Sequence, residues 1–141
     1  MLKNFLKERE RESSNNKNVL IIALLVHAAK IDENYTENEK TIIKKVIMDL
    51  NKISSNQAGK LLKLAEKKEE ESNQIIEFTK EIKKYSMEFK LKIVEIIWKI
   101  VYSDGTSDDY ESNLIRRICG LLYISDKDNG IIKAKVQNLL K

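Results

Sequence analysis

The sequence predicts an all-α fold, a single compact bundle of about seven helices. The 141 residues include no proline and only four glycines, so the residue types that interrupt helices are rare. Charged residues make up 34% of the chain and are mostly Lys and Glu, which favour helix at exposed positions. Apolar residues recur at helical spacing through most of the sequence. A chain of this length can bury a sizeable core as one domain.

Residues 1–17 are expected to form a short amphipathic helix followed by a linker. Leu2, Phe5 and Leu6 share one helical face, and the Ser- and Asn-rich run 13–16 then interrupts the pattern. Such a segment frays, docks on its own domain, or binds a membrane surface or a partner. Residues 18–141 are expected to form the helical domain itself.

The first main helix is expected at residues 18–31. Its stretch 19–29 is apolar on all sides except at His27, as in a central, buried helix. His27 and Cys119 are the only residues of their types, and both lie on apolar faces, where a packing role is expected rather than a catalytic dyad. A single Cys excludes a disulfide framework and favours a reducing cytoplasm.

Hydroxyl side chains mark the starts of the helices that follow. Thr36 and Glu39 have the spacing of a capping box, in which the hydroxyl accepts a free backbone N–H and the carboxylate reaches back to the cap. Ser54 and Ser86 are expected to cap two further helices. The acidic run 69–71 suits the N-terminal end of a helix between those two. The expected helices are 18–31, 37–50, 55–69, 71–84, 87–102, 109–123 and one that starts at 125 or 126.

An acidic loop between two apolar helices occurs twice, at an offset of 72 residues. Asp32 and Glu39 in the first copy match Asp104 and Glu111 in the second, since 104 − 32 and 111 − 39 both equal 72. Flanking apolar residues match at the same offset, and each copy closes with Ile-Ser, with one residue more in the first copy. We therefore predict an internal duplication of a helix–acidic loop–helix unit, with repeat units at about 19–69 and 90–141.

Asp32, Glu39, Asp104 and Glu111 are the candidate ligands for a divalent cation. If the two copies pack with pseudo-twofold symmetry, these carboxylates converge at one end of the bundle, where a cation would relieve their repulsion. Oxygen-only ligation suits a hard cation such as Ca²⁺ or Mg²⁺. The structural alternative is that the glutamates complete capping boxes and the aspartates are ordinary turn residues. The loops do not follow the EF-hand spacing.

No other chemistry is indicated by the sequence, and an enzyme is not expected. There is no phosphate-cradling glycine loop, nucleophile elbow or HExxH motif, and one His with one Cys cannot build a zinc site. The net charge of +4 is spread over interspersed Lys and Glu, so nucleic-acid binding is not expected. No signal peptide or membrane-spanning run is present, which favours a cytoplasmic location. The sequence does not predict an oligomeric state.

The two loops resemble those of the tellurite-resistance protein B (TerB) family. The shared pattern is an apolar helix that ends in Asp, often followed by Gly, then polar residues, a Glu, an amphipathic helix and Ile-Ser. It covers about residues 18–137, and it departs only in the first copy, where Glu33 stands in place of Gly105. The resemblance implies an all-helical domain with a divalent-metal site at Asp32, Glu39, Asp104 and Glu111. It also implies a role in tellurite or other stress responses, often near the membrane.

Two functional hypotheses remain open at this point. In the first, the chain is a non-enzymatic, cytoplasmic TerB-like domain that binds a divalent cation through its acidic loops during a stress response. In the second, the loops are only helix caps, and the chain is an adaptor that binds a protein partner or a membrane surface.

Overall fold

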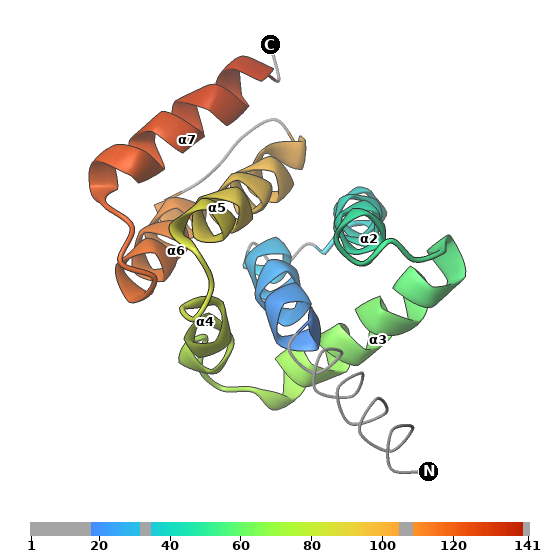
Figure 1. Ribbon diagram of the computed structural model, residues 1–141. Coiled ribbons are helices and arrows are strands. Elements are labelled where there is room, and N and C mark those ends of the chain that lie inside the picture. The colour runs from blue at the N-terminus through green and yellow to red at the C-terminus, as the bar shows by residue number, and fades with distance from the viewer. Residues whose placement is uncertain (1–17, 32–34, 105–108, 140–141) are drawn as a thin grey trace.

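The computed structural model describes residues 18–31, 35–104 and 109–139, and this part of the chain is helical with no strand (Figure 1). The all-α fold is confirmed, and the described residues form seven α-helices and one 3-10 turn. We call the helix at 18–30 the central helix. The other elements are α2 (Glu37–Asn51), α3 (Ser55–Glu71), α4 (Ile76–Ile82), α5 (Met87–Val101), η1 (Tyr102–Asp104), α6 (Asp109–Leu121) and α7 (Asp126–Leu139).

The helix starts follow the capping residues that the sequence indicated. Thr36, Ser54 and Ser86 immediately precede α2, α3 and α5, and each side-chain oxygen accepts the backbone N–H three residues later, at 3.1 to 3.2 Å. Ser125 makes the same contact before α7, at 3.1 Å. These caps satisfy N–H groups that a helix leaves free at its start, so the boundary is determined locally.

The fourth helix is shorter than expected, because the acidic run 69–71 belongs to the end of α3. Glu69 there binds the central helix: its carboxylate lies 2.8 Å from Lys30 Nζ and 3.1 Å from His27 Nδ1. This contact between helices holds the last turn of α3 in place. Helix α3 ends at Glu71, and the hydroxyl of the next residue, Ser72, donates a hydrogen bond to the carboxylate of Glu77 at 2.7 Å.

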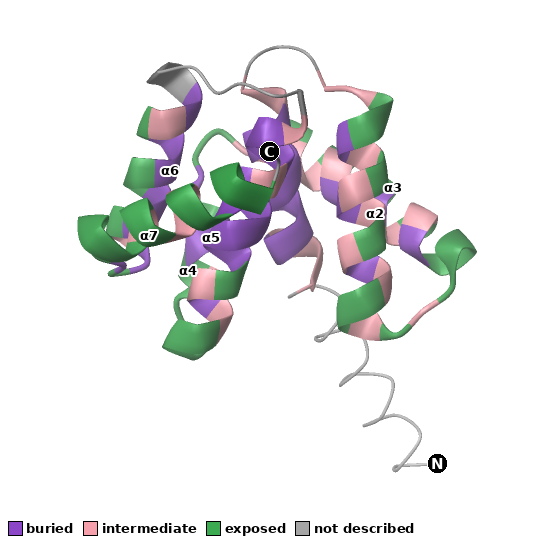
Figure 2. Ribbon diagram, turned by 90° about the horizontal axis from the view of Figure 1, so that it is seen from above, coloured by how far each residue is buried: buried purple, intermediate pink, exposed green. Residues whose placement is uncertain are grey.

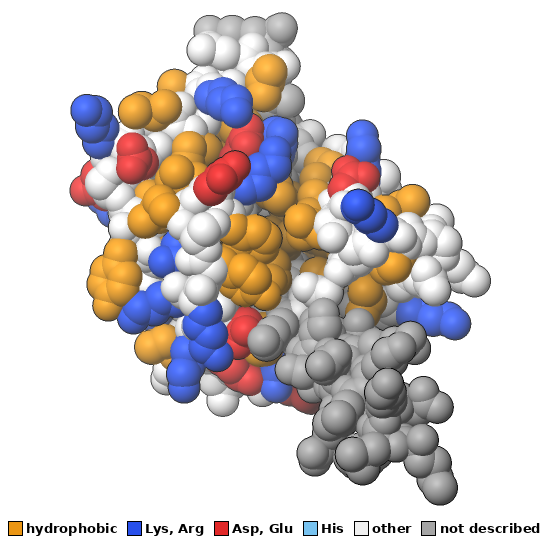
Figure 3. All heavy atoms as spheres, in the orientation of Figure 1, with side chains coloured by type: hydrophobic (Ala, Val, Ile, Leu, Met, Phe, Trp, Pro, Cys, Tyr) orange, Lys and Arg blue, Asp and Glu red, His pale blue; other side chains and the backbone are white. Residues whose placement is uncertain are grey.

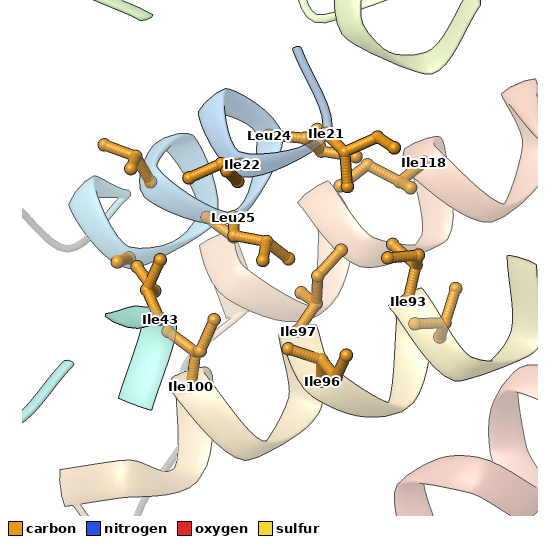
Figure 4. Packing of buried hydrophobic residues seen from close by; sticks show 14 of the residues in the cluster. Ile21, Ile22, Leu24, Leu25, Ile43, Ile93, Ile96, Ile97, Ile100 and Ile118 are labelled. Atoms are coloured by element: carbon orange, nitrogen blue, oxygen red, sulfur yellow. The ribbon is translucent and has the colours of Figure 1, made fainter. Parts of the chain in front are cut away.

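The core lies around the central helix, whose residues 21–26, 28 and 29 are all at most 3% exposed. Buried residues face inward on the helices that surround it (Figure 2). Figure 4 shows apolar side chains of the central helix, α2, α5 and α6 meeting in one layer, among them Leu25, Ile43, Ile97 and Ile118. Each side chain of this size contributes about 1.5 to 3 kcal/mol when it is fully buried, so this layer accounts for much of the stability.

Helix α7 docks on α5 and η1 through Val136, the partly buried Ile132 and several polar contacts. Val136 is its one fully buried apolar side chain among the described residues, whereas Ile131 and Leu139 are 58% and 63% exposed. The contacts are Trp98 Nε1 to Asn129 Oδ1 (2.9 Å), Gln137 Nε2 to Tyr102 Oη (2.8 Å) and Lys135 Nζ to Glu95 Oε1 (2.8 Å).

The helix positions follow the expected offset between the two halves. Helix α2 starts at Glu37 and α6 at Asp109, a difference of 109 − 37 = 72. Helices α3 and α7 start 126 − 55 = 71 residues apart. Equal spacing of helix starts does not establish that the halves superpose, so the internal duplication stays a prediction. Among the described helices, none combines the length and the apolar character needed to span a bilayer.

Candidate functional site

The two acidic segments are attached to the same side of the molecule. Figure 2 shows the starts of α2 and α6 on that side, where the central helix and α5 end. Of the four predicted ligands, Asp32 lies outside the described residues, and so does the side chain of Asp104. The structure therefore describes Glu39 and Glu111, and it does not test the set of four as a metal centre.

Glu39 is buried, with 6% of its surface exposed, and it forms the predicted capping box. Its Oε1 accepts the backbone N–H of Thr36 at 2.8 Å and the Thr36 hydroxyl at 3.0 Å. The Glu39 backbone N–H in turn donates to Thr36 Oγ1 at 3.1 Å. The structure therefore confirms that Glu39 and Thr36 form the two halves of the capping box at the start of α2.

Glu111 occupies the corresponding place at the start of α6. It is the third residue of its helix, as Glu39 is of α2, and it is 5% exposed. Burial of a carboxylate is costly unless hydrogen bonds or opposite charges compensate it. The two glutamates that the sequence singled out are thus both the third residue of a helix, and both are buried.

Two further polar side chains, those of Tyr35 and Glu66, lie at the end of the bundle where α2 begins. The sequence did not single out either of them. Burial raises the pKa of the Tyr35 hydroxyl, and the carboxylates of Glu66, Glu39 and Glu37 raise it further. Glu66 is close to that hydroxyl, but no contact of hydrogen-bond geometry to it exists among the described residues. Glu66 lies on α3 amid many Lys and Glu residues, so only the packing of α3 on α2 reveals that it faces the first acidic segment.

The described residues do not form a complete metal centre or a nucleophilic site. They contain no group of three or more His, Cys, Asp or Glu side chains arranged to hold a metal ion. Burial, with Asp126 as a smaller cause, raises the pKa of Cys119 to about 12. Its thiol is therefore protonated near neutral pH and is not activated as a nucleophile. His27 is engaged by Glu69 rather than by this thiol.

Comparison with known protein families agrees with this architecture. The family model described as "Tellurite resistance protein TerB" matches residues 18–134, which include both acidic segments and most of the chain. No curated protein and no solved structure matches the chain. The family match confirms the resemblance carried by the two acidic loops. The chain therefore belongs to the tellurite resistance protein TerB family.

Proposed function

We propose that this TerB domain is a non-enzymatic protein that binds a divalent cation, Ca²⁺ or Mg²⁺, in a cytoplasmic stress response. The site would lie at the end of the bundle where α2 and α6 begin. The observation that carries this proposal is the burial of Glu39 and Glu111 at the third position of both helices.

A comparison with α3 explains why this burial points to more than helix capping. The capping box of α3 pairs Ser54 with Gln57, a neutral side chain that remains exposed. A cap therefore needs neither a charge nor burial at this position. Glu39 and Glu111 place two carboxylates at the end of the bundle where α2 and α6 begin, and a cation bound there would add favourable electrostatic interactions with both of them.

The donor types fit a hard cation. Glu39 and Glu111 provide carboxylate oxygens, Asp32 and Asp104 would complete the set, and Glu66 brings a further carboxylate to the same end. Carboxylate oxygens are the ligands that Ca²⁺ and Mg²⁺ prefer. The cation would supply positive charge that stabilises the two loops together, which is a structural or sensing role rather than a catalytic one.

The test is a thermal melt of the whole chain with EDTA, Mg²⁺, Ca²⁺ or Mn²⁺. A cation that binds only the folded state stabilises it by about 2.7 kcal/mol at a hundredfold excess over Kd. Since 1 kcal/mol shifts the melting temperature of a domain of this size by roughly 3 °C, we expect a rise of roughly 8 °C. The rise should disappear in Asp32→Asn/Asp104→Asn.

A matched control separates loss of ligands from loss of negative charge. Asp49→Asn/Asp128→Asn makes the same chemical change at two exposed positions outside the loops, and it should keep the full metal-dependent rise. If the wild-type protein shows no metal-dependent shift, the proposal is wrong. The acidic residues then act as helix caps, and an adaptor function without metal becomes the better hypothesis.

A further inference from the structure

A groove with a volume of about 590 Å³ runs between α2 and the C-terminal half of α7, with α5 beneath it. Ile42 and Val46 of α2, Ile96 of α5 and Val136 of α7 form its apolar surface. Figure 3 shows hydrophobic side chains gathered in the hollow between these helices, with charged side chains on both sides. The groove is separate from the buried glutamates at the start of α2 and α6.

The lining residues have the spacing of a surface against which a further helix packs. On α2 they include 38, 42, 45 and 49, with 46 and 50 beside them, and on α5 they are 92, 96 and 99, a run that Ser103 of η1 continues. Both runs have steps of four, three and four residues, which is the seam that a helix presents to a neighbouring helix. Each run spans twelve residues, and its eleven steps cover about 16 Å at a rise of 1.5 Å per residue. Two parallel seams of this length fit a partner helix of about three turns.

The groove is positively charged at its margins. Lys45, Lys92 and Lys99 line it and Asp49 is the one acidic lining residue, an excess of two positive charges (3 − 1 = 2). The ammonium groups of Lys92 and Lys99 lie 3.5 and 3.9 Å from the carboxylate of Glu95.

Both of these lysines are able to turn toward a ligand in the groove. Glu95 has a closer partner in Lys135, at 2.8 Å, so its charge stays compensated when Lys92 and Lys99 move. The side chains of Lys92 and Lys99 are 59% and 41% exposed, and surface ion pairs of this kind contribute at most about 1 kcal/mol.

We propose that this groove binds an acidic amphipathic helix of a partner protein. Leucine-like side chains of the partner would contact Ile42, Val46 and Ile96, and its flanking carboxylates would pair with Lys45, Lys92 and Lys99. The exposed Leu50 and Leu139, 45% and 63% exposed, line the same groove and would close over the apolar face of the ligand.

A protein helix fits these features better than a flat anionic membrane surface. The apolar residues lie at the bottom of a concave groove, whereas a membrane would require them on a convex, protruding face. A second copy of the chain is also disfavoured, because the exposed faces of its described helices carry Lys and Glu together rather than an acidic stripe.

The probe is a fluorescein-labelled synthetic helix of fifteen residues, with Leu on one face and Glu on both flanks. Fluorescence anisotropy measures its binding to the full chain, alongside a peptide with every Glu replaced by Lys and a scrambled peptide. We expect the acidic peptide to bind at least about tenfold more tightly than either control, with an affinity that falls as salt is added. Methyl NMR shifts should concentrate at Ile42, Val46 and Ile96.

Paired variants test the charges and the apolar contacts separately. Lys92→Gln/Lys99→Gln should weaken binding by about fivefold to tenfold, whereas Lys60→Gln/Lys63→Gln on α3 should change it less than about twofold. Leu50→Asn/Leu139→Asn should weaken it by about tenfold. Its matched control, Leu64→Asn/Ile131→Asn, changes side chains that are 54% and 58% exposed elsewhere and should leave binding intact.

Four results of the peptide and variant measurements would overturn the proposal. They are equal binding of the scrambled peptide, methyl shifts away from the groove, equal losses in the test and control variants, or no binding at all. The proposal also fails if the groove methyl groups respond to phosphatidylglycerol vesicles but not to the peptide, or shift with protein concentration alone. The NMR measurement uses the wild-type chain, so a variant that folds poorly does not decide the outcome.

Discussion

Replacement of Glu95 by Gln tests how α7 is held on the bundle. Glu95 lies on α5, is 8% exposed, and has its carboxylate oxygens 2.8 Å from Lys135, 3.5 Å from Lys92 and 3.9 Å from Lys99. Lys135 lies on α7, so this shortest contact joins two helices. The substitution keeps the shape of the side chain and removes its charge.

The expected loss in the free energy of unfolding is about 1 to 2 kcal/mol. A hydrogen bond to a charged group contributes about 1.5 to 3 kcal/mol, and an exposed ion pair at most about 1 kcal/mol. Glu95 is buried while Lys135 is 62% exposed, so the value lies between these limits. Removing one partner of a fully buried ion pair costs more, because the other charge is left buried. That larger cost does not apply here, since the lysines that lose the Glu95 charge are exposed to water.

The loss should depend on pH in a defined direction. The hydrogen bond from Lys135 lowers the pKa of Glu95 below its ordinary value of 4.5, against the opposing effect of burial, and Lys92 and Lys99 assist. A lowered pKa in the folded state gives stability that is present above the unfolded pKa and lost as the pH falls through the folded pKa. The difference between wild type and Glu95→Gln should therefore be full near neutral pH and shrink in acid below the ordinary pKa.

Urea unfolding followed by circular dichroism, near neutral pH and in acid, measures both effects. Glu70→Gln is the matched control, because Glu70 is 69% exposed and lies 3.9 Å from Lys30, and surface changes of this kind stay within about 0.5 kcal/mol. The reasoning is refuted if Glu95→Gln is as stable as wild type near neutral pH. A loss that persists undiminished in acid would also refute it, since it would come from packing rather than charge.

Two further predictions concern a helix cap and the buried thiol. Thr36→Ala should destabilise the chain by about 1 kcal/mol in urea unfolding, because it removes the hydroxyl that caps α2, whereas Thr41→Ala in the exposed middle of the same helix should not. An equal loss in both variants would contradict the capping role. Cys119, with its pKa raised to about 12 and its side chain buried, should react with Ellman's reagent only as fast as the chain unfolds. Full reaction of the native protein within minutes would contradict that expectation.

Helix starts were predictable because their signals are local. A hydroxyl residue just before an apolar helical pattern identified the starts of α2, α3 and α5 to the residue, at Thr36, Ser54 and Ser86. The end of α3 was not predictable in this way. The contacts of Glu69 with His27 and Lys30 cross 39 to 42 residues of sequence, so the pattern around residue 70 carries no sign of them.

The two candidate sites differ in how much the sequence revealed. The doubled spacing singled out Glu39 and Glu111, and both are buried in the structure. Their role as metal ligands stays a prediction. Glu66 was missed because a single Glu on a charged helix has no distinguishing neighbours in sequence. The groove was missed because the apolar pattern of α2 and α7 is the same whether a helix covers those residues or not. Leu50, on the apolar side of α2, is 45% exposed in the structure.

The groove exists because the two helices that form its sides are anchored to different neighbours. Helix α2 packs mainly on α3, and α7 packs mainly on α5. On α7 that packing depends on Val136 and a few polar contacts. No described helix fills the space between α2 and α7, so the apolar seam of α2 at Ile42 and Val46 stays partly exposed above the buried Ile96. Helix-on-helix packing completes such a seam with another helix, and the lysines along its margins favour one with acidic flanks.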